Sequence, residues 1–229
     1  LELVGRLSRA RAAAVARYLP MGVDEAARRY VQRAVVDGRV ASATFKVKGD
    51  LGDFPFAGTS AQPAAPTSGE FRITARAQDV TLAYVPSQAD WESPWPALSR
   101  LNGELVFDRN SMEIRNASAS VYGVELTRVN GGIRDLAQSV LLIQGQGRGP
   151  LADLLRYAEV TPVGEWTSHA LRTATATGNA ELDLKLEIPI KTRPNLELII
   201  FKVCEATSEN ESNPDNAAAQ VAIDIHNGY

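Results

Sequence analysis

The stretch that decides the fold is Ala180-Glu181-Leu182-Asp183-Leu184-Lys185-Leu186-Glu187-Ile188-Pro189-Ile190, in which apolar and charged residues alternate without a break. Successive side chains of a β-strand point to opposite faces, so this period of two predicts a strand with one apolar and one charged face. The apolar face then meets an apolar environment and the charged face meets water. The pattern indicates a protein that works through an apolar sheet surface rather than through a catalytic pocket.

The same alternation recurs upstream in shorter segments. These segments are separated by residues that are typical of tight turns. Asp108-Arg109-Asn110 is a turn candidate, and glycines at 123, at 131–132 and over 145–149 mark further turns. A weak repeat, in which glycines 49, 103 and 178 precede a polar and then an apolar residue, favours a repeated β architecture. The predicted strands span residues 45–51, 71–77, 101–107, 111–115, 117–122, 124–129 and 140–144.

Helical signals lie on either side of this strand region. An apolar stripe from Leu3 to Tyr18 predicts a first helix that Pro20 ends. Asp24 is the candidate N-cap of a second helix over residues 25–36, with Gly38 as its stop signal. Pro150 suits the first turn of a short helix over 151–158. A further helical turn is predicted over 166–171.

Composition limits the classes of function. The chain has 229 residues and 45% hydrophobic composition, which is enough for a substantial core. A net charge of −3 gives no support to a nucleic-acid partner. Cys204 is the only cysteine, so no internal disulfide is possible. No apolar run approaches the roughly 18 residues needed to span a bilayer, and we expect the chain to be an excised part of a longer protein.

The residues that could carry chemistry lack suitable neighbours. His169 and His226 have no second metal-ligand residue at helical spacing, and Cys204 has no local base. Asp90 and Glu92 flank Trp91 in a way typical of loop decoration rather than of a sugar-cleaving site. Segment 145–149 lacks the Gly-Lys-Ser/Thr ending of a phosphate loop. We therefore predict no catalytic residues, no metal site and no cofactor, and a protein that is not an enzyme.

A series of short motifs resembles the central region of YhdP-type proteins of the AsmA-like superfamily. The resemblance lies in the order and spacing of these motifs and covers roughly residues 1–190. The motifs are Gly49-Asp-Leu-Gly-Asp-Phe-Pro-Phe56, Gly69-Glu-Phe-Arg-Ile73, Tyr84-Val-Pro86, Trp95-Pro-Ala-Leu98, Leu101-Asn-Gly-Glu-Leu-Val-Phe107, Gly131-Gly-Ile-Arg-Asp-Leu136 and Gly147-Arg-Gly-Pro-Leu-Ala-Asp-Leu-Leu155.

The resemblance implies a segment of a large envelope protein of Gram-negative bacteria, with an inner-membrane anchor elsewhere and a periplasmic body. Such a protein is expected to carry phospholipid from the inner to the outer membrane along a repeating β-groove. The expected partners are phospholipid acyl chains, the remaining segments of the same long chain and envelope proteins at either membrane.

The expected fold class is α+β, mainly antiparallel β: a curved multi-strand sheet that forms a groove, with N-terminal helices and one short helix near 150–158. Three parts are predicted. Residues 1–38 are a helical segment that packs on the sheet, residues 39–190 form the groove region, and residues 191–229 are a divergent part. The last part contains a strand over 196–203 and a polar run, 205–216, that we expect to be disordered.

Apolar positions of the predicted strands are the candidates for the inner, lipid-contacting face of the groove. Two alternatives stay open: the same residues could form a closed core beneath the helices of a structural or interaction module, acting through edge strands or the Trp91/Trp95 loop. A hydrolase would require His169 or His226 to meet a carboxylate and a nucleophile. The candidates are Phe71, Ile73, Leu105, Phe107, Leu182, Leu184, Leu186 and Ile188.

Overall fold

In the part of the chain that the structure describes, ten strands form one sheet, and each strand is antiparallel to the next along the chain. The computed structural model describes residues 1–19, 23, 25–54, 56, 69–137, 140–166, 168–169, 172, 177–189, 200–208 and 223–224. The strands are β1 (Glu2–Arg11), β2 (Val35–Lys48), β3 (Glu70–Leu82), β4 (Leu98–Asp108), β5 (Ser111–Val121), β6 (Val124–Ile133), β7 (Val140–Pro150), β8 (Asn179–Pro189), β9 (Ile200–Ser208) and β10 (Ile223–Asp224). The α+β class, mainly antiparallel β, is confirmed.

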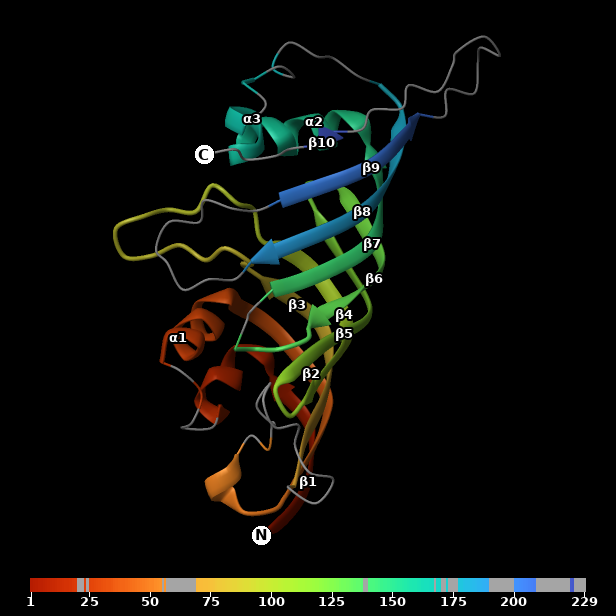
Figure 1. Ribbon diagram of the computed structural model, residues 1–229. Coiled ribbons are helices and arrows are strands. Elements are labelled where there is room, and N and C mark those ends of the chain that lie inside the picture. The colour runs from red at the N-terminus through yellow and green to blue at the C-terminus, as the bar shows by residue number, and fades with distance from the viewer. Residues whose placement is uncertain are drawn as a thin grey trace.

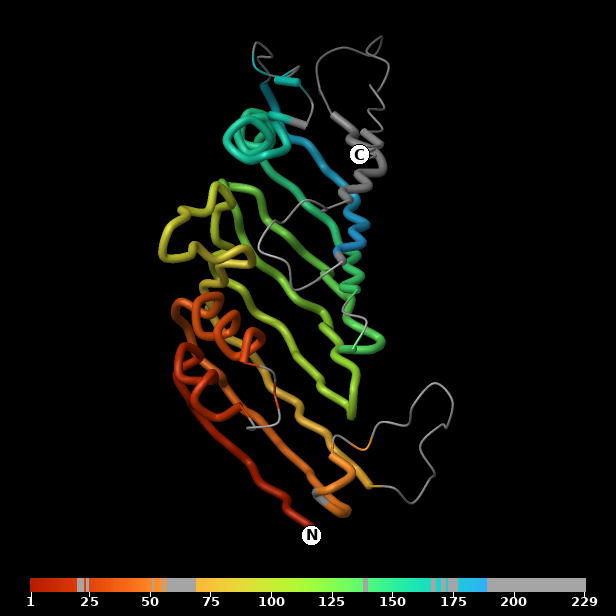
Figure 2. Tube along the Cα trace, turned by 60° about the vertical axis from the view of Figure 1, so that its left-hand side comes forward, coloured from red at the N-terminus to blue at the C-terminus, as the bar shows by residue number. Residues whose placement is uncertain are grey.

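Short helices occupy the connections between strands, and they lie on one side of the sheet (Figure 1). The helices are η1 (Ala12–Tyr18), α1 (Glu25–Ala34), η2 (Leu51–Asp53), α2 (Leu151–Val160) and α3 (Pro162–Trp166). Because the sheet is a meander, every second connection emerges at the same end of the strands. The η1–α1 pair, the β3–β4 loop of residues 83–97 and the α2–α3 pair therefore lie along one rim of the sheet (Figure 2).

The sheet is strongly twisted, and a line of bulges accompanies the twist. Each strand from β1 to β6 contains a residue with positive φ on this line, and the register of every pairing from β2–β3 to β6–β7 shifts near it. Bulges bend a strand and increase its twist. The adjacent bulges thus curve the sheet along one line. The positive-φ residues on this line are Arg9, Gly38, Asp79, Arg100, Asn116 and Arg128, and the β1–β2 pairing keeps its register at Arg9.

Two asparagines hold neighbouring bulges together in the same way. The Asn102 side chain accepts a hydrogen bond from the Asp79 backbone N–H (3.1 Å) and donates one to the Arg100 carbonyl (2.7 Å). Asn130 repeats both bonds on the next pair of bulges, with 2.8 Å for each. Both asparagines stand in the sequence Arg-x-Asn-Gly, at 100–103 and 128–131. This Arg-x-Asn-Gly repeat has a structural role in the sheet. The glycine repeat noted in the sequence does not mark strand starts, since Gly103 lies inside β4.

The N-terminal helix predicted over Leu3 to Tyr18 is wrong. Residues 2–11 form strand β1, and only Ala12–Tyr18 are helical, as a 3-10 helix. Leu3 and Leu7 are four residues apart, a spacing that fits one face of a helix and one face of a strand equally. The strand prevails because β2 supplies a long partner that pairs with β1 from Lys48 to Arg39.

The second helix ends earlier than predicted. Helix α1 stops at Ala34, and the β-branched Val35 and Val36 begin β2, a strand ten residues longer at its start than the alternation at 45–51 predicted. Gly38 is therefore a bulge residue of β2 rather than a helix stop. The candidate cap Asp24 and Pro20 lie outside the described residues.

The turns predicted at glycines 131–132 and 145–149 are wrong. Glycines 131–132 lie inside β6, and 145–149 lie inside β7. At Gly131 a Cβ atom would come within 2.0 Å of the Leu142 carbonyl oxygen, so this glycine permits close approach of two strands. The two strands predicted over 111–122 are one strand that bends at Asn116.

The C-terminal predictions are partly corrected. Strand β9 extends to Ser208 and so includes the first residues of the run predicted to be disordered. Residues 209–222 and residues 57–68 lie outside the described part of the chain. Trp166, the first residue of the helical turn predicted over 166–171, is instead the last residue of α3 (Pro162–Trp166). Helix α2 confirms the predicted helix after Pro150.

Candidate functional site: the apolar face of the sheet

Strand register joins the apolar side chains into one continuous surface. Two rows of directly opposed residues cross the sheet on the same face, and no polar residue interrupts either row. The first row is Gly5, Phe45, Ile73, Phe107, Met112, Ile133, Leu141 and Ile188. The second row is Leu7, Ala43, Ala75, Leu105, Ile114, Gly131, Ile143 and Leu186.

All eight predicted site residues lie on this face. Phe71 stands two positions from Ile73 in β3, and Leu184 and Leu182 follow Leu186 at the same spacing in β8. Every one of the eight is half-buried: its side chain is neither enclosed nor fully exposed. In β7, Gly145 and Gly147 are the cross-strand partners of Leu184 and Leu182 in β8. The structure therefore brings the whole set together on one surface.

Among the described residues, two of the eight pack against side chains from the connections between strands. The Phe54 ring meets Phe71 edge-on, with 5.0 Å between ring centroids, and Phe54 also meets Phe56. Phe56 is buried against Gly49 and Gly69 at the β2–β3 connection. Ile188 packs against a core cluster of Val85 and Trp95. The remaining six form what we call the open floor: Ile73, Leu105, Phe107, Leu182, Leu184 and Leu186.

A second group of side chains, around Trp95, packs at the rim where the η1–α1 pair, the β3–β4 loop and the α2–α3 pair lie. Val85 and Trp95 are 5% and 7% exposed, and Tyr84, Tyr157, Val163 and Ile188 pack against them. We call these six residues the rim cluster. They come from the β3–β4 loop, α2, α3 and β8, so one core ties together elements that are distant in sequence.

Tyrosine hydroxyls link the three inserts along this rim. The Tyr30 hydroxyl of α1 donates to the Tyr84 carbonyl (2.9 Å), and the Tyr84 and Tyr157 hydroxyls share a hydrogen bond (2.8 Å). The rings of Tyr84 and Trp95 meet edge-on at 6.0 Å. Burial raises the pKa of all three tyrosines, so they remain neutral donors at physiological pH.

Sequence reasoning missed the role of these tyrosines. The sequence placed Trp95 only in a loop with Trp91, and Tyr84 only in a short motif before Pro86. No periodicity marks them, because residues of three separate connections meet only after the meander places those connections at one rim. The one available signal was the number of aromatic residues in segments predicted to be loops.

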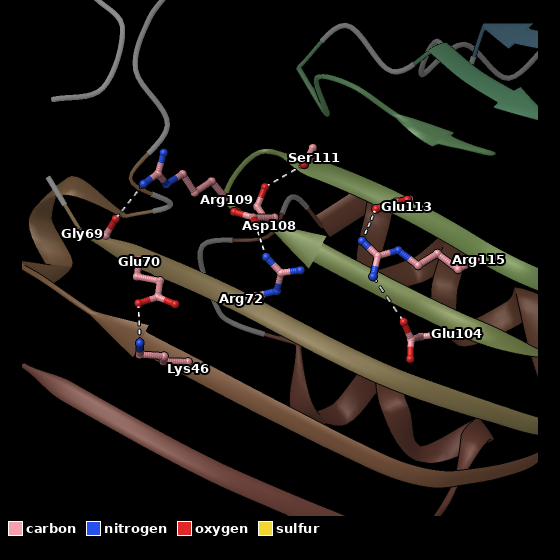
Figure 3. A network of polar contacts seen from close by, with 10 residues as sticks. All are labelled: Lys46, Gly69, Glu70, Arg72, Glu104, Asp108, Arg109, Ser111, Glu113 and Arg115. Atoms are coloured by element: carbon pink, nitrogen blue, oxygen red, sulfur yellow. Dashed lines mark hydrogen bonds and ion pairs between the residues drawn. The ribbon is translucent and has the colours of Figure 1, made fainter. Parts of the chain in front are cut away.

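The opposite face of the sheet is charged and paired (Figure 3). Lys46 lies 2.6 Å from Glu70, and Arg72 lies 2.8 Å from Asp108 on the next strand pair. Arg115 bonds Glu113 at 2.7 Å, and this hydrogen bond lowers the pKa of the Glu113 carboxyl. All these side chains stay partly exposed, and the N-terminal helices lie behind the strands in this view. This is the face that meets water.

Candidate catalytic groups remain isolated within the described part of the chain. His169 does meet a carboxylate, with 3.3 Å between its Nδ1 and Glu159 Oε1, but it is about half exposed and no hydroxyl or thiol is bonded to it there. Among the described residues, no group of acidic, histidine or cysteine side chains could hold a metal ion. Nor does any described helix combine the length and apolar character needed to cross a membrane.

Comparison with known proteins agrees with the family resemblance that the motifs indicated. The family model described as YhdP protein matches residues 1–195. The chain belongs to the YhdP family. It is 25% identical over 183 residues to the intermembrane phospholipid transporter YhdP of Escherichia coli strain K12. That match covers 80% of this chain and 13% of the relative, so the chain spans a small part of the relative's length. No solved structure matches.

Proposed function

We propose that this chain is a segment of a periplasmic lipid-transfer bridge, which carries phospholipid between the inner and outer membranes along the apolar face of its sheet. The observation that carries the proposal is the open floor, six large apolar side chains that remain half-buried on a surface crossing the strands. The relative in Escherichia coli, an intermembrane phospholipid transporter, supports the same function.

The energetics favour a surface of this kind. Exposing an acyl chain of about 15 methylenes to water costs roughly 12 kcal/mol, so a transfer path has to cover the chain along its whole length. An antiparallel sheet can offer one apolar and one wetted face over many strands. The apolar rows and the ion pairs on the opposite face match that requirement.

In this proposal the partners are phospholipid acyl chains and the neighbouring segments of the same long chain, with envelope proteins at either membrane. The bridge is anchored in the inner membrane by another segment. The division of the chain into parts at 38/39 and 190/191 stays a prediction. No catalytic step is assigned to this segment.

Site-specific photo-crosslinking in the native envelope tests the proposal. A probe replaces Leu184 on the floor and, separately, Lys185, the adjacent residue on the charged face. We expect phospholipid to be captured at position 184 and not at 185, because adjacent strand residues face opposite environments. Ile188 is a second control, since the rim cluster already contacts it.

The competing function is a structural module of the envelope with a closed core, and the rim cluster is the observation in its favour. Equal capture at 184 and 185, or capture at neither, would contradict lipid transfer along this face and support the module. Capture at 184 but not at 188 would further assign the lipid path to the open floor.

A further inference from the structure

In four neighbouring strands, the apolar face of the sheet continues across a change in the spacing of its residues. On the side of the open floor, successive apolar residues are two positions apart, as in any regular strand. At the line of bulges the step is three positions, yet both residues of each step are apolar and stay on the apolar face. The steps are Ala77 to Val80 in β3, Leu101 to Leu98 in β4, Ile114 to Ala117 in β5 and Val129 to Leu126 in β6.

The additional residue in each step decides which side chains join the apolar face beyond the bulge. A shift of one residue moves every later side chain of a strand to the opposite face. If β5 continued past Ile114 with a regular period, Ser118 and Ser120 would join the apolar face. In the structure Ser120 instead opposes Glu125 on the charged face, and Ala119 lies on the apolar face. The bulges therefore keep the apolar surface continuous from the open floor towards the rim.

Each of the four steps contains a residue other than glycine in the left-handed region. The φ angle is 50° at Asp79, 52° at Arg100, 44° at Asn116 and 51° at Arg128. This conformation is unfavourable for a residue with a Cβ atom and persists where surrounding contacts hold it. The contacts made at the bulges therefore decide whether the change in spacing is maintained.

Asn130 supplies such contacts to two bulges at once. Neither Asn116 of β5 nor Arg128 of β6 has a directly opposed partner in the strand register. The Asn130 side chain accepts a hydrogen bond from the Asn116 backbone N–H and donates one to the Arg128 carbonyl, at 2.8 Å each. One exposed side chain thus satisfies a backbone group at each of two neighbouring bulges.

Asn102 holds the preceding pair of bulges in the same way, and that pair has a further contact. Arg100 Nη2 donates a hydrogen bond to Ser120 Oγ (2.6 Å), and Ser120 is 4% exposed. Arg100 also pairs with a carboxylate of β6. Within the described part of the chain, Arg128 forms no ion pair. The second pair of bulges therefore depends on Asn130 more than the first depends on Asn102.

We propose that Asn102 and Asn130 are positioning residues of the lipid path, a role that rests on the proposed lipid transfer. By holding the bulges, they keep the apolar side chains of β3 to β6 on one continuous face. Both lie on the charged face, where Asn102 opposes Ser118 and Asn130 opposes Gln144, so they act through the strands and not by contact with lipid.

The consequence is largest in β6. Without the Asn130 side chain, the bulge at Arg128 loses the donor to its carbonyl, and the stretch of β6 beyond it is free to slip by one residue. Such a slip turns Leu126 away from the apolar face and brings Thr127 onto it. The effect is local, because the pairing of β7 with β8 has no register shift.

Amide hydrogen exchange of the full chain, measured by NMR, examines the contact directly. Asn130→Ala should speed exchange of the Asn116 N–H about fivefold, because its acceptor is removed. Exchange of the Asp79 N–H should not change, since its acceptor is Asn102. The control Gln144→Ala removes an exposed amide side chain directly opposite Asn130 and should alter neither rate.

Photo-crosslinking in the native envelope reports which residues of β6 face lipid. A probe replaces Leu126, which opposes Gly147 on the apolar face, or Thr127 on the charged face. In the unaltered protein we expect phospholipid to be captured at 126 and not at 127. Asn130→Ala should lower the ratio of capture at 126 to capture at 127 at least about threefold. Capture at Leu184 should stay unchanged.

Deletion of Arg128 from the Asn130→Ala variant is the rescue. The step from Val129 to Leu126 then becomes two residues, so Leu126 stays opposite Gly147 without a bulge to be held. Capture at 126 should return to the level of the unaltered protein. A role of Asn130 in stability alone predicts no rescue, because the deletion restores no hydrogen bond.

Substitutions at Arg128 decide if the shortened protein does not fold. Arg128→Val places a β-branched residue where φ is positive and should reproduce the effect of Asn130→Ala on capture. Arg128→Gly suits this conformation and should leave capture at 126 unchanged. Equal effects of the two substitutions would contradict the positioning role.

The outcomes separate this role from lipid transfer itself. Absence of capture at 184 in the unaltered protein would refute lipid transfer along the apolar face. With capture at 184 present, an unchanged ratio of capture at 126 and 127 in Asn130→Ala would overturn the positioning role alone. The same conclusion would follow if capture at 126 and at 184 fell in equal proportion, or if the folded deletion variant failed to restore capture at 126.

Discussion

The rim cluster and the open floor are built from similar residues but are packed in opposite ways. Trp95 and Val85 are enclosed by side chains from four elements. Leu184 and Leu105 lie on the same apolar face of the sheet and keep part of their surface exposed. The difference teaches that hydrophobic composition does not itself define a core: a core forms where connections fold back over the sheet, and a binding surface remains where they do not.

The largest expected effect is loss of the rim cluster through Trp95→Ala. Removing this buried ring leaves a cavity that costs about 3–5 kcal/mol of unfolding free energy. Urea denaturation of the full chain measures the loss. Trp91→Ala is the matched control, because Trp91 is 42% exposed in the same loop, and it should change stability by no more than about 0.5 kcal/mol.

A charge on the floor sharpens the comparison. Leu184→Asp should lower stability by no more than about 2 kcal/mol if the floor is partly solvated, whereas a fully buried unpaired charge would cost several kcal/mol and unfold the domain. In the native envelope the same variant should impair lipid passage. A thermal melt together with an assay of lipid transfer checks both expectations; an unaltered melt with unaltered transfer would contradict the proposed role of this residue.

The tyrosine link predicts a smaller loss and a particular pH dependence. Tyr84→Phe removes the hydrogen bond between two partly buried hydroxyls and should cost about 1 kcal/mol. Because burial raises the pKa of Tyr84 and Tyr157, the folded state holds their protons more tightly than the unfolded chain does. Stability should therefore be constant below the unfolded value, about pH 10, and fall as pH rises above it.

Urea denaturation of the unaltered chain and of Tyr84→Phe at increasing pH measures this loss. The variant should show a weaker alkaline decline. An equal decline in both proteins would mean that other groups cause it.

The smallest effect is expected on the charged face. Asp108→Asn breaks the ion pair with Arg72. Both side chains of this pair are 45% exposed, so the change should lower the free energy of unfolding by about 0.5 kcal/mol or less. High salt should erase the difference, because exposed pairs are screened. Denaturation at low and high ionic strength checks this. A loss comparable to that of Trp95→Ala would mean that the ion pairs, rather than the rim cluster, hold the sheet.

Alternation in the sequence predicted the meander and the face of each candidate residue. A strand period of two depends only on local backbone geometry, so Leu182 through Ile188 could be assigned to one face without knowledge of their neighbours. Where local signals were ambiguous, prediction failed. Leu3 and Leu7 suited a helix and a strand alike, and the glycines of β7 looked like a turn. Pairing with a neighbouring strand decided both cases.

The sequence by itself determined that one face of this protein is apolar and the other charged, because the two-residue period fixes side-chain direction. Only the tertiary structure decided which apolar residues are enclosed and which stay open. Ile188 and Leu184 belong to the same strand and the same face, yet only Ile188 meets the rim cluster. That contact depends on where the connections fold in space, which no local pattern encodes.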